Sequence, residues 1–364
     1  MSALADWLAR QAPSWLRGEH GPLAPRHRRA LLAIQRCRTP ALGGRVYACT
    51  GCGKHDFAYH SCHHRACPRC GGGDTAEWTR KQTARLLPVP YFFWTFTVPE
   101  ELRGAFVAEP RLLHDLLFEA AAAALQAVAA VPRHLGGELG FCAVLHTWGR
   151  QLQHHPHLHV IVPGGGLRAD GKRWQRCRQR DWFLPVLAVA AAFRSSFAEA
   201  LRARAKPLHA AVPGEVWQRD WNVDVQPAGT GEAVLRYLAR YVKRTAISDE
   251  RIIEASEREV TFAYTESDTG RRRERTLPAE EFMRRYLRHV PDVGEHRVRY
   301  FGWMHPSARA RRMKVQTLLA VPIVVRAAAP TPPAWHLRCP HCEAFALVCV
   351  GTLPRGPPAA LRVA

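Results

Sequence analysis

The chain has 364 residues, which is enough to bury a sizeable core in two or three domains. Its 52 Lys and Arg against 31 Asp and Glu give a formal charge of +21, which favours a polyanionic partner and points to nucleic acid. Eleven cysteines, several of them in C-x-x-C pairs, argue against a disulfide framework and for zinc in a reducing compartment.

The first part of the chain combines helical periodicity with a cysteine cluster. Residues 1–36 alternate apolar and basic positions and predict a short helical leader. Cys49/Cys52 and Cys67/Cys70 follow as two C-x-x-C pairs separated by fourteen residues, a spacing typical of zinc ribbons and treble clefs. We therefore expect one four-cysteine structural zinc site. Cys37 and Cys62 are additional thiols that leave a second zinc site open.

Strands and helices alternate after this cluster. Residues 76–87 predict a basic helix, and the aromatic and β-branched run 91–98 predicts a strand that ends at Pro99. Residues 103–131 predict a helix, and 141–148 predict a second strand. Short connections between the strands favour antiparallel neighbours.

The next strand carries a row of histidines. Read as β-structure, 155–162 directs His155, His157 and His159 to one face, with Leu158, Val160 and Val162 on the other. Ile161 continues the histidine row with an apolar residue, so we expect a central strand packed on both faces. Imidazoles at i and i+2 can converge on one divalent cation. The candidates for a third ligand are His155, Gln151, Gln153 and His146.

The segment 166–172 resembles a phosphate-binding P-loop only superficially. Arg173 stands where a Ser or Thr must bind magnesium, so we read Asp170-Gly171 as a hairpin turn and reject a nucleotide site. Residues 185–205 then predict an amphipathic helix, and 221–225 predict another strand.

Two tyrosines share one face of the next predicted helix. Tyr237 and Tyr241 lie four residues apart within 232–246, between an apolar side and a basic side. The candidate phosphate-binding residues on the basic side are Arg236, Arg240, Lys243 and Arg244. A phenol is a weak nucleophile at neutral pH because its pKa is near 10. A nearby base or cation favours the phenolate, while a metal polarises the phosphate under attack.

The remaining chain predicts a hairpin, a helix and a tail. The hairpin spans 260–264 and 271–277, and a helix starts at Pro278. Aromatic residues at 300–303, near two arginines, are candidates either for stacking on unpaired bases or for the core. Cys339-x-x-Cys342 is half of a zinc knuckle, with His336, His341 or Cys349 available to complete it.

These motifs resemble the rolling-circle transposases of the insertion-sequence-91 group, including the common-region elements, which belong to the HUH (histidine-hydrophobic-histidine) enzymes. The resemblance extends from about residue 35 to about residue 325. It rests on the upstream cysteines, His157-Leu158-His159, the segment 145–149 (LHTWG), the segment 236–241 (RYLARY), Glu281-Phe282 and the segment 299–302 (RYFG). The family has Gln after Trp-Gly, whereas Arg150 follows here, so the third ligand stays open.

The resemblance implies a metal-dependent endonuclease and strand transferase that acts on single-stranded element ends. In such enzymes a tyrosine attacks the scissile phosphate and leaves a 5′-phosphotyrosine and a free 3′-hydroxyl. Carried over, His157 and His159 are ligands of Mg²⁺ or Mn²⁺, and Tyr237 and Tyr241 are the nucleophiles. Retaining the phosphoester on the protein conserves its bond energy, which agrees with the missing ATP-binding loop.

Three other readings explain fewer of these features. A plasmid replication initiator or relaxase would use the same chemistry. A histidine-triad nucleotide hydrolase fits the spacing of the histidine row, apart from Pro156, but leaves the basic charge, the cysteines and the tyrosines unexplained. A non-enzymatic zinc-binding DNA regulator leaves the histidines and tyrosines without a role.

We expect an α+β fold with an HUH-type antiparallel sheet flanked by helices, an N-terminal cysteine-rich zinc module and a mostly helical C-terminal part. The expected segments are a helical leader and zinc-binding DNA-contact module (1–87), the HUH catalytic domain (88–250), a C-terminal extension (251–326), and a linker with the half knuckle and tail (327–364). No signal-peptide pattern opens the chain, and the apolar run 120–131 is too short to span a bilayer, so we expect a cytoplasmic, nucleoid-associated protein.

Overall fold

The computed structural model describes residues 2–70, 72–179, 181, 183–242, 246–266, 268–321 and 337–356, without the side chains of 72–77 and 240–242. The chain forms two compact units, each assembled from separate segments. Unit 1 comprises residues 1–72, 247–291 and 323–364, and unit 2 comprises 73–246 and 292–322. The structure thus draws the boundaries differently from the four consecutive segments expected, because 247–291 and the C-terminal segment join the N-terminal residues.

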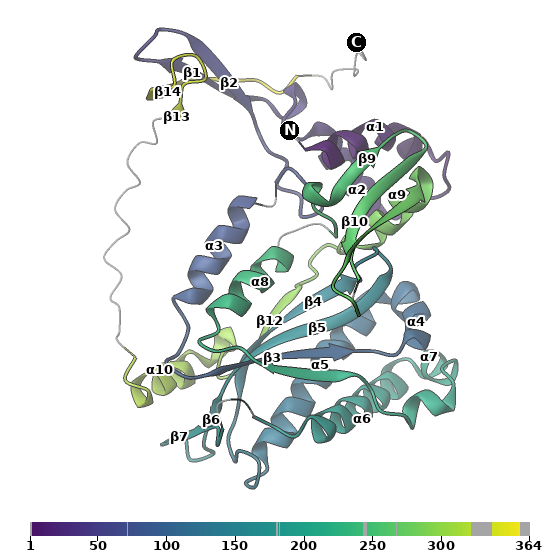
Figure 1. The fold of residues 1–364 in the computed structure, drawn as a ribbon, viewed down its shortest axis with the longest axis vertical. Coiled ribbons are helices and arrows are strands. Elements are labelled where there is room, and N and C mark those ends of the chain that lie inside the picture. The colour runs from purple at the N-terminus through teal and green to yellow at the C-terminus, as the bar shows by residue number, and fades with distance from the viewer. Residues whose placement is uncertain are drawn as a thin grey trace. The chain divides into compact units, whose positions relative to one another are not determined.

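A five-stranded antiparallel sheet forms the centre of unit 2, with the strand order β12-β4-β5-β3-β8 (Figure 1). Its strands are β3 (Tyr91–Thr97), β4 (Gly140–Trp148), β5 (His154–Pro163), β8 (Val223–Pro227) and β12 (Val298–Gly302). The aromatic and β-branched composition of β3 and β5 favours strands with two buried faces. The histidine-bearing strand is therefore central, as the sequence predicted.

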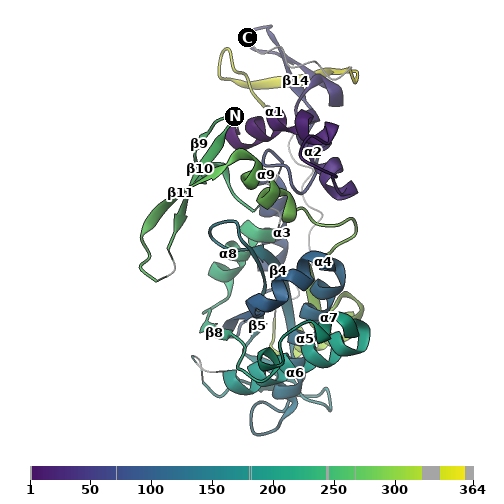
Figure 2. The same ribbon diagram turned by 90° about the vertical axis from the view of Figure 1, so that its right-hand side faces the viewer.

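One face of this sheet carries the main hydrophobic core of unit 2. Helices α5 (Pro110–Ala130) and α6 (Val186–Arg204) lie against it (Figures 1 and 2). The residues that β5 directs into this core are Leu158, Val160 and Val162. The expected alternation of β5 is thus confirmed on this face.

Helix α8 (Glu232–Val242) lies on the opposite face, against β4 and β5. Leu235 and Leu238 of this helix are buried with Ile161 of β5. Burying each of these leucines stabilises the docked helix by about 1.5–3 kcal/mol. Trp78 of α3 (Gly72–Thr83) packs partly against the same cluster. The histidine face of β5 is therefore covered by α8 rather than by solvent.

The predicted helix 103–131 is interrupted. It divides into α4 (Arg103–Ala108) and α5, because Glu109 precedes Pro110 and leaves the helical conformation with φ −127° and ψ 62°. A 3₁₀ turn, Glu100–Leu102, directly precedes α4. By length and composition α5 could cross a membrane. Most of its apolar residues are instead buried in the core of unit 2, so it is a core helix of this fold.

Smaller elements complete unit 2. The segment that superficially resembles a P-loop contributes to a hairpin, β6 paired with β7, and is not a phosphate cradle. The elements are β6 (Gly165–Leu167), β7 (Trp174–Arg176), α7 (Lys206–Ala210), α10 (Arg309–Leu318) and the 3₁₀ turns Gly214–Trp217 and Pro306–Ala308.

Unit 1 contains two sheets and three helices among its described residues. The sheets are β11-β10-β9 and β13-β14-β1-β2. The helices are α1 (Ala3–Arg17), α2 (Pro25–Arg36) and α9 (Ala279–Arg288), with 3₁₀ turns at Pro40–Leu42 and Asp249–Arg251. The strands are β1 (Gly44–Cys49), β2 (His55–Tyr59), β9 (Ile252–Ala255), β10 (Glu259–Thr265), β11 (Arg272–Pro278), β13 (Leu337–Arg338) and β14 (Phe345–Leu353).

Contacts of Trp7 explain why residues 247–291 join the leader helices. The Trp7 indole donates to the carbonyl of Ser256 at 2.6 Å, and its ring meets Phe282 of α9 edge-on at 5.3 Å. The backbone N–H of Leu4 donates to the carboxylate of Asp249 at 2.8 Å. Figure 2 shows α1, α9 and the hairpin β10–β11 in one group. Antiparallel sheets, flanking helices and N-terminal cysteines confirm the expected α+β class.

Candidate metal centres and nucleophile helix

Three histidines of unit 2 form a group on the face of the sheet that α8 covers. One ring nitrogen from each of His146, His157 and His159 lies within 4.8 Å of the others. Strand register places them there, because His146 of β4 is directly opposite His157 of β5, and His159 is two residues further along β5. The ring centroids of His146 and His159 are 4.3 Å apart, and those of His157 and His159 are 4.8 Å apart.

Hydrogen bonds orient two of these imidazoles. Nδ1 of His157 lies 2.7 Å from the carbonyl oxygen of His155, so Nδ1–H donates and Nε2 keeps the lone pair that a metal needs. Nδ1 of His159 lies 3.2 Å from the hydroxyl of Thr95, the residue opposite it on β3. Such partners fix the ring orientation and the tautomer of metal-binding histidines.

The electrostatic environment keeps the three rings neutral. Burial lowers the pKa of His157 to about 4. Burial and the neighbouring histidines lower the pKa values of His146 and His159 well below the usual range. Neutral imidazole is the form that binds a metal. The three imidazoles can therefore bind a metal at neutral pH without first losing a proton.

The structure brings one of the candidate third ligands to the histidine pair. That residue is His146. His155 is half-buried outside the group, although its ring centroid is 5.0 Å from that of His157. Gln153 is exposed, and its side-chain oxygen accepts from the backbone N–H of Gln151 at 3.0 Å, which closes the turn between β4 and β5. Gln151 lies in the same turn, and its role as a ligand stays a prediction.

Trp148 and Arg297 form a chain of ring contacts that ends at His146. The Trp148 ring stacks on the His146 ring at 5.5 Å, and the Arg297 guanidinium lies 5.6 Å from the centroid of Trp148. Glu295, two residues before Arg297 in the sequence, pairs with His114 of α5 at 2.6 Å, and both of these side chains are 7% exposed. Although burial opposes it, the His114 hydrogen bond and the charges of His114 and Arg297 lower the pKa of Glu295 to about 2.

Replacing Glu295 with glutamine should destabilise unit 2 by about 3 kcal/mol at neutral pH, because a shift from 4.5 to about 2 stabilises the ionised form by that amount. A carboxylate with a lowered pKa contributes fully above its unfolded value, and the contribution disappears as the pH falls through its folded value. The difference between wild type and Glu295→Gln in urea unfolding should therefore shrink below about pH 4.5 and vanish near pH 2.

Glu119→Gln is the matched control for this experiment. Glu119 pairs with Arg204 in the same unit, but both side chains are 46% exposed. Exposed pairs contribute about 0–1 kcal/mol, so this variant should unfold nearly as the wild type does. Equal destabilisation of the two variants would contradict the assignment of a buried pair.

Tyr237 of α8 lies next to His159, one of the three grouped histidines. Its ring centroid is 5.9 Å from that of His159 and 5.8 Å from that of Phe93, and both rings are met edge-on. The burial of Leu235 and Leu238 on either side of it fixes the rotation of the helix. Tyr237 is 39% exposed, so its ring lies between the buried histidines and solvent.

The other predicted residues of this helix are only partly described. The backbone of Tyr241 is helical, but its side chain and that of Arg240 lie outside the described residues, as do Lys243 and Arg244 entirely. Arg236 is exposed and lies 3.9 Å from Glu232, one turn earlier. Such a surface pair is weak and leaves the Arg236 guanidinium available to a phosphate. The role of Arg236 in binding DNA stays a prediction.

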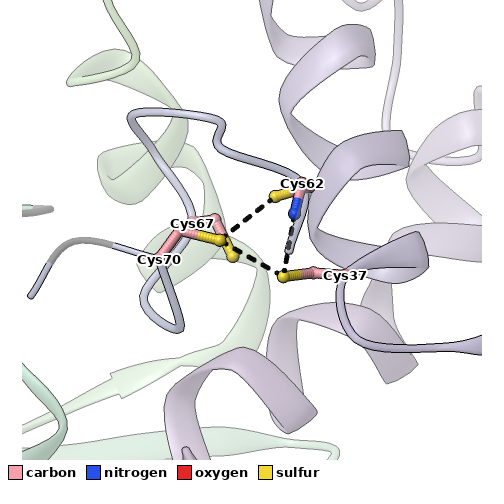
Figure 3. Close-up of side chains that lie close together, drawn as sticks. All are labelled: Cys37, Cys62, Cys67 and Cys70. Atoms are coloured by element: carbon pink, nitrogen blue, oxygen red, sulfur yellow. Dashed lines mark hydrogen bonds between the residues drawn. The ribbon is translucent and has the colours of Figure 1, made fainter. Parts of the chain in front are cut away.

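Cysteines form two separate groups of four in unit 1. The first contains Cys37, Cys62, Cys67 and Cys70, whose Sγ atoms lie within 4.8 Å of one another. Figure 3 shows these sulfur atoms facing a common point, with Cys37 directly after α2 and the other three in the loop that follows β2. The Cys37–Cys70 and Cys62–Cys70 sulfur distances are 3.3 and 3.6 Å. Hydrogen bonds from Cys62 and Cys67 lower the pKa of Cys37, which favours a thiolate.

The second group contains Cys49, Cys52, Cys339 and Cys342. The expected grouping of Cys49/Cys52 with Cys67/Cys70 is therefore wrong, although each of these residues lies in a four-cysteine group. Cys67/Cys70 joins the additional thiols Cys37 and Cys62. The half knuckle Cys339/Cys342 is completed by Cys49/Cys52 rather than by His341 or Cys349. His336, the other candidate, lies outside the described residues.

The aromatic residues at 300–303 belong to the fold rather than to a base-stacking surface. They lie on or directly after β12, an edge strand that pairs with β4. Trp303 is 1% exposed, and Phe301 stacks on Phe141 at 5.2 Å. This strand was not predicted from the sequence, because its arginines are typical of a nucleic-acid-binding surface. In the structure, Arg299 instead pairs with Asp115.

Comparison with known families now identifies the class of protein. A family described as "Transposase zinc-binding domain" matches residues 7–98, which contain all four cysteines of the first group. A family described as "Putative transposase" matches residues 140–312, which contain the three histidines and Tyr237. The chain is therefore a transposase with a zinc-binding domain.

Two relatives narrow the assignment from the class of transposases to a family. The chain is 39% identical to a protein of Sinorhizobium fredii (strain NBRC 101917 / NGR234) named "Putative transposase y4qJ", over 85% of its own length and 82% of that protein. It is 29% identical to the transposase for insertion sequence element IS801 of Pseudomonas savastanoi pv. phaseolicola, over 85% of this chain and 76% of the relative. The chain belongs to the IS91 family of transposases. No solved structure matches it.

Proposed function

We propose that this transposase is a metal-dependent HUH endonuclease and strand transferase that acts on single-stranded DNA in rolling-circle transposition. Tyr237, whose ring lies next to that of His159, is one candidate nucleophile, and Tyr241 on the same helix is the other. The observation that carries this proposal is the 5.9 Å separation between the Tyr237 and His159 rings. Cleavage of a phosphodiester through a covalent intermediate needs a nucleophile that DNA can reach and a metal beside it. The partly exposed Tyr237 phenol and the three neutral imidazoles would supply these.

The reaction is a transesterification in which a new bond replaces the old one. The phenolic oxygen of Tyr237 forms a bond to phosphorus, and the bond from phosphorus to the 3′-oxygen breaks. The phenol loses its proton and the departing oxygen gains one, which leaves a 5′-phosphotyrosine and a 3′-hydroxyl. No nucleotide cofactor is needed, because a later attack by a DNA 3′-hydroxyl on the phosphotyrosine reverses the exchange and joins strands.

The three histidines suit a divalent cation as the cofactor. Their donor set contains imidazole nitrogen and no carboxylate, which favours a transition ion such as Mn²⁺ over Mg²⁺. When bound, such a cation polarises the scissile phosphate and stabilises the charge that develops on it. The chain supplies the rest: His155 and Thr95 orient two ligands, and Leu235 and Leu238 anchor the helix that carries Tyr237.

The proposed substrate is single-stranded DNA at the ends of the element and at the target. A net charge of +21 provides long-range attraction to phosphate, and exposed Arg236 is one residue away from Tyr237. We further propose that the protein acts in the cytoplasm at the nucleoid. The first cysteine group would hold the structural zinc of the matched domain, since its sulfur distances approach the edge of about 3.8 Å that tetrahedral Zn–S bonds require.

The test is covalent capture of DNA. Incubating the protein with single-stranded element ends and Mn²⁺ should give an adduct that survives SDS, and peptide mapping should place the nucleotide on Tyr237 or Tyr241. EDTA and the double change Tyr237→Phe with Tyr241→Phe should each abolish the adduct. Tyr264→Phe, in a strand of unit 1, is the control and should leave it unchanged. Binding of cognate ends without any adduct would contradict the proposal.

A further inference from the structure

We propose that Cys49, Cys52, Cys339 and Cys342 form a second structural zinc site, which fastens the C-terminal residues 337–356 to the N-terminal strands. The matched zinc-binding domain ends at residue 98, so two of these four ligands lie far outside it. The site would close a loop of more than 280 residues, because Cys52 and Cys339 are 287 positions apart. This proposal is independent of the catalytic chemistry proposed above.

The sulfur geometry fits a tetrahedral ion. The Cys49–Cys342 and Cys52–Cys339 sulfur distances are 3.6 and 3.7 Å, and the four sulfurs lie within 4.8 Å of one another. Four sulfurs about 2.3 Å from zinc are separated by about 3.8 Å along each edge of the tetrahedron. A disulfide needs sulfurs at about 2.05 Å, so the cross-pair distances match metal ligands better than disulfides.

Both C-x-x-C turns have the same backbone structure. In each, the first cysteine donates its N–H five residues ahead, and the residue after the second cysteine donates back to the first. These bonds are Cys49 to Lys54 at 2.9 Å, Gly53 to Cys49 at 2.9 Å, Cys339 to Ala344 at 2.8 Å and Glu343 to Cys339 at 2.9 Å. Gly53 and Glu343 take left-handed φ values of 71° and 61°. A non-glycine residue at such a φ costs free energy, so the second turn is held in shape by its surroundings.

The strands next to this site lack the apolar core that would otherwise hold them together. β14 pairs antiparallel with β1 from Gly44↔Leu353 to Cys49↔Leu347, as Figure 1 shows for β14 and β1. Among the described residues, the cluster next to the site has three buried members, Cys49, Cys339 and Leu347, with Tyr47 and Ala346 partly buried against it. Larger apolar side chains of β14 are exposed, including Phe345 at 71% and Val350 at 56%. Small modules of this kind need a metal to fold.

The first experiment measures zinc in the purified full-length protein. Cys339→Ser with Cys342→Ser should contain one zinc fewer per chain than the wild type. Cys349→Ser is the matched control, because Cys349 is exposed on β14, the strand that follows Cys342, and lies outside the group. It should keep the wild-type zinc content. A double variant with the wild-type zinc content would overturn the proposal.

A second experiment needs no variant, so a folding failure cannot obscure the result. Cys52, Cys342 and Cys349 are all exposed. In fresh wild-type protein, iodoacetamide should modify Cys52 and Cys342 at least tenfold more slowly than Cys349, and removing zinc with a chelator should abolish the difference. Equal rates before chelation would overturn the proposal, as would an intact mass that shows disulfides at these positions.

Discussion

Replacing His157 with alanine should lower the rate of phosphotyrosine formation by about a thousandfold, which corresponds to about 4 kcal/mol of transition-state stabilisation. The imidazole is one of the three grouped donors, and its Nδ1–H bond to the carbonyl of His155 commits Nε2 to the metal. Two remaining ligands should hold a divalent cation more weakly, so saturating Mn²⁺ should restore part of the rate. Single-turnover cleavage at several Mn²⁺ concentrations measures both effects.

His155→Ala is the control that separates a ligand from a neighbour. It removes an imidazole two residues away on the same strand but keeps the backbone carbonyl that His157 uses. We expect a change of less than about tenfold, because this ring lies outside the group of three. If His155→Ala is as slow as His157→Ala, the assignment of the metal ligands to His146, His157 and His159 is wrong.

Local sequence pattern predicted the histidine strand well. Alternation at period two made one face of β5 apolar, and Ile161 in the histidine row showed that the other face was also covered. The choice of His146 as the third ligand required the register between β4 and β5. That register contains an irregularity between His146 and Trp148, and Leu152 in the turn takes a φ of 61°. Neither feature follows from spacing, so the sequence left several candidates open.

The cysteine grouping shows the limit of spacing more clearly. Two C-x-x-C pairs fourteen residues apart favour a local site, and Cys339/Cys342 has no second pair nearby in sequence. The structure separates the local pairs because Cys49 and Cys52 lie at the turn of the hairpin β1–β2, beside β14, whereas Cys67 and Cys70 lie in the loop after β2. Pairing between strands about 300 residues apart leaves no local signal in a single sequence. Assembly of unit 1 from three segments was hidden for the same reason.

Removing Cys37 and Cys70 together should unfold the loop 60–70 and release one zinc per chain. This loop has no helix or strand, and its buried residues are Ala66 and Cys67. Structural zinc contributes about 10–16 kcal/mol in small zinc-finger peptides, which is more than the few contacts of such a loop provide. In Cys37→Ser/Cys70→Ser, the backbone amides of residues 60–70 should lose their protection from hydrogen exchange. Cys177→Ser, in unit 2, should behave as the wild type.

Pairs of changes within and between the groups provide the sharpest test of this arrangement. Cys37→Ser and Cys67→Ser remove ligands of the same ion, so together they should release no more zinc than either alone. Cys49→Ser and Cys67→Ser remove ligands of different ions, so their losses should add. The grouping that sequence spacing favours predicts the opposite for the second combination, because Cys49 and Cys67 would then share one ion. The zinc content of these three single and two double variants therefore decides which strands the metals hold together.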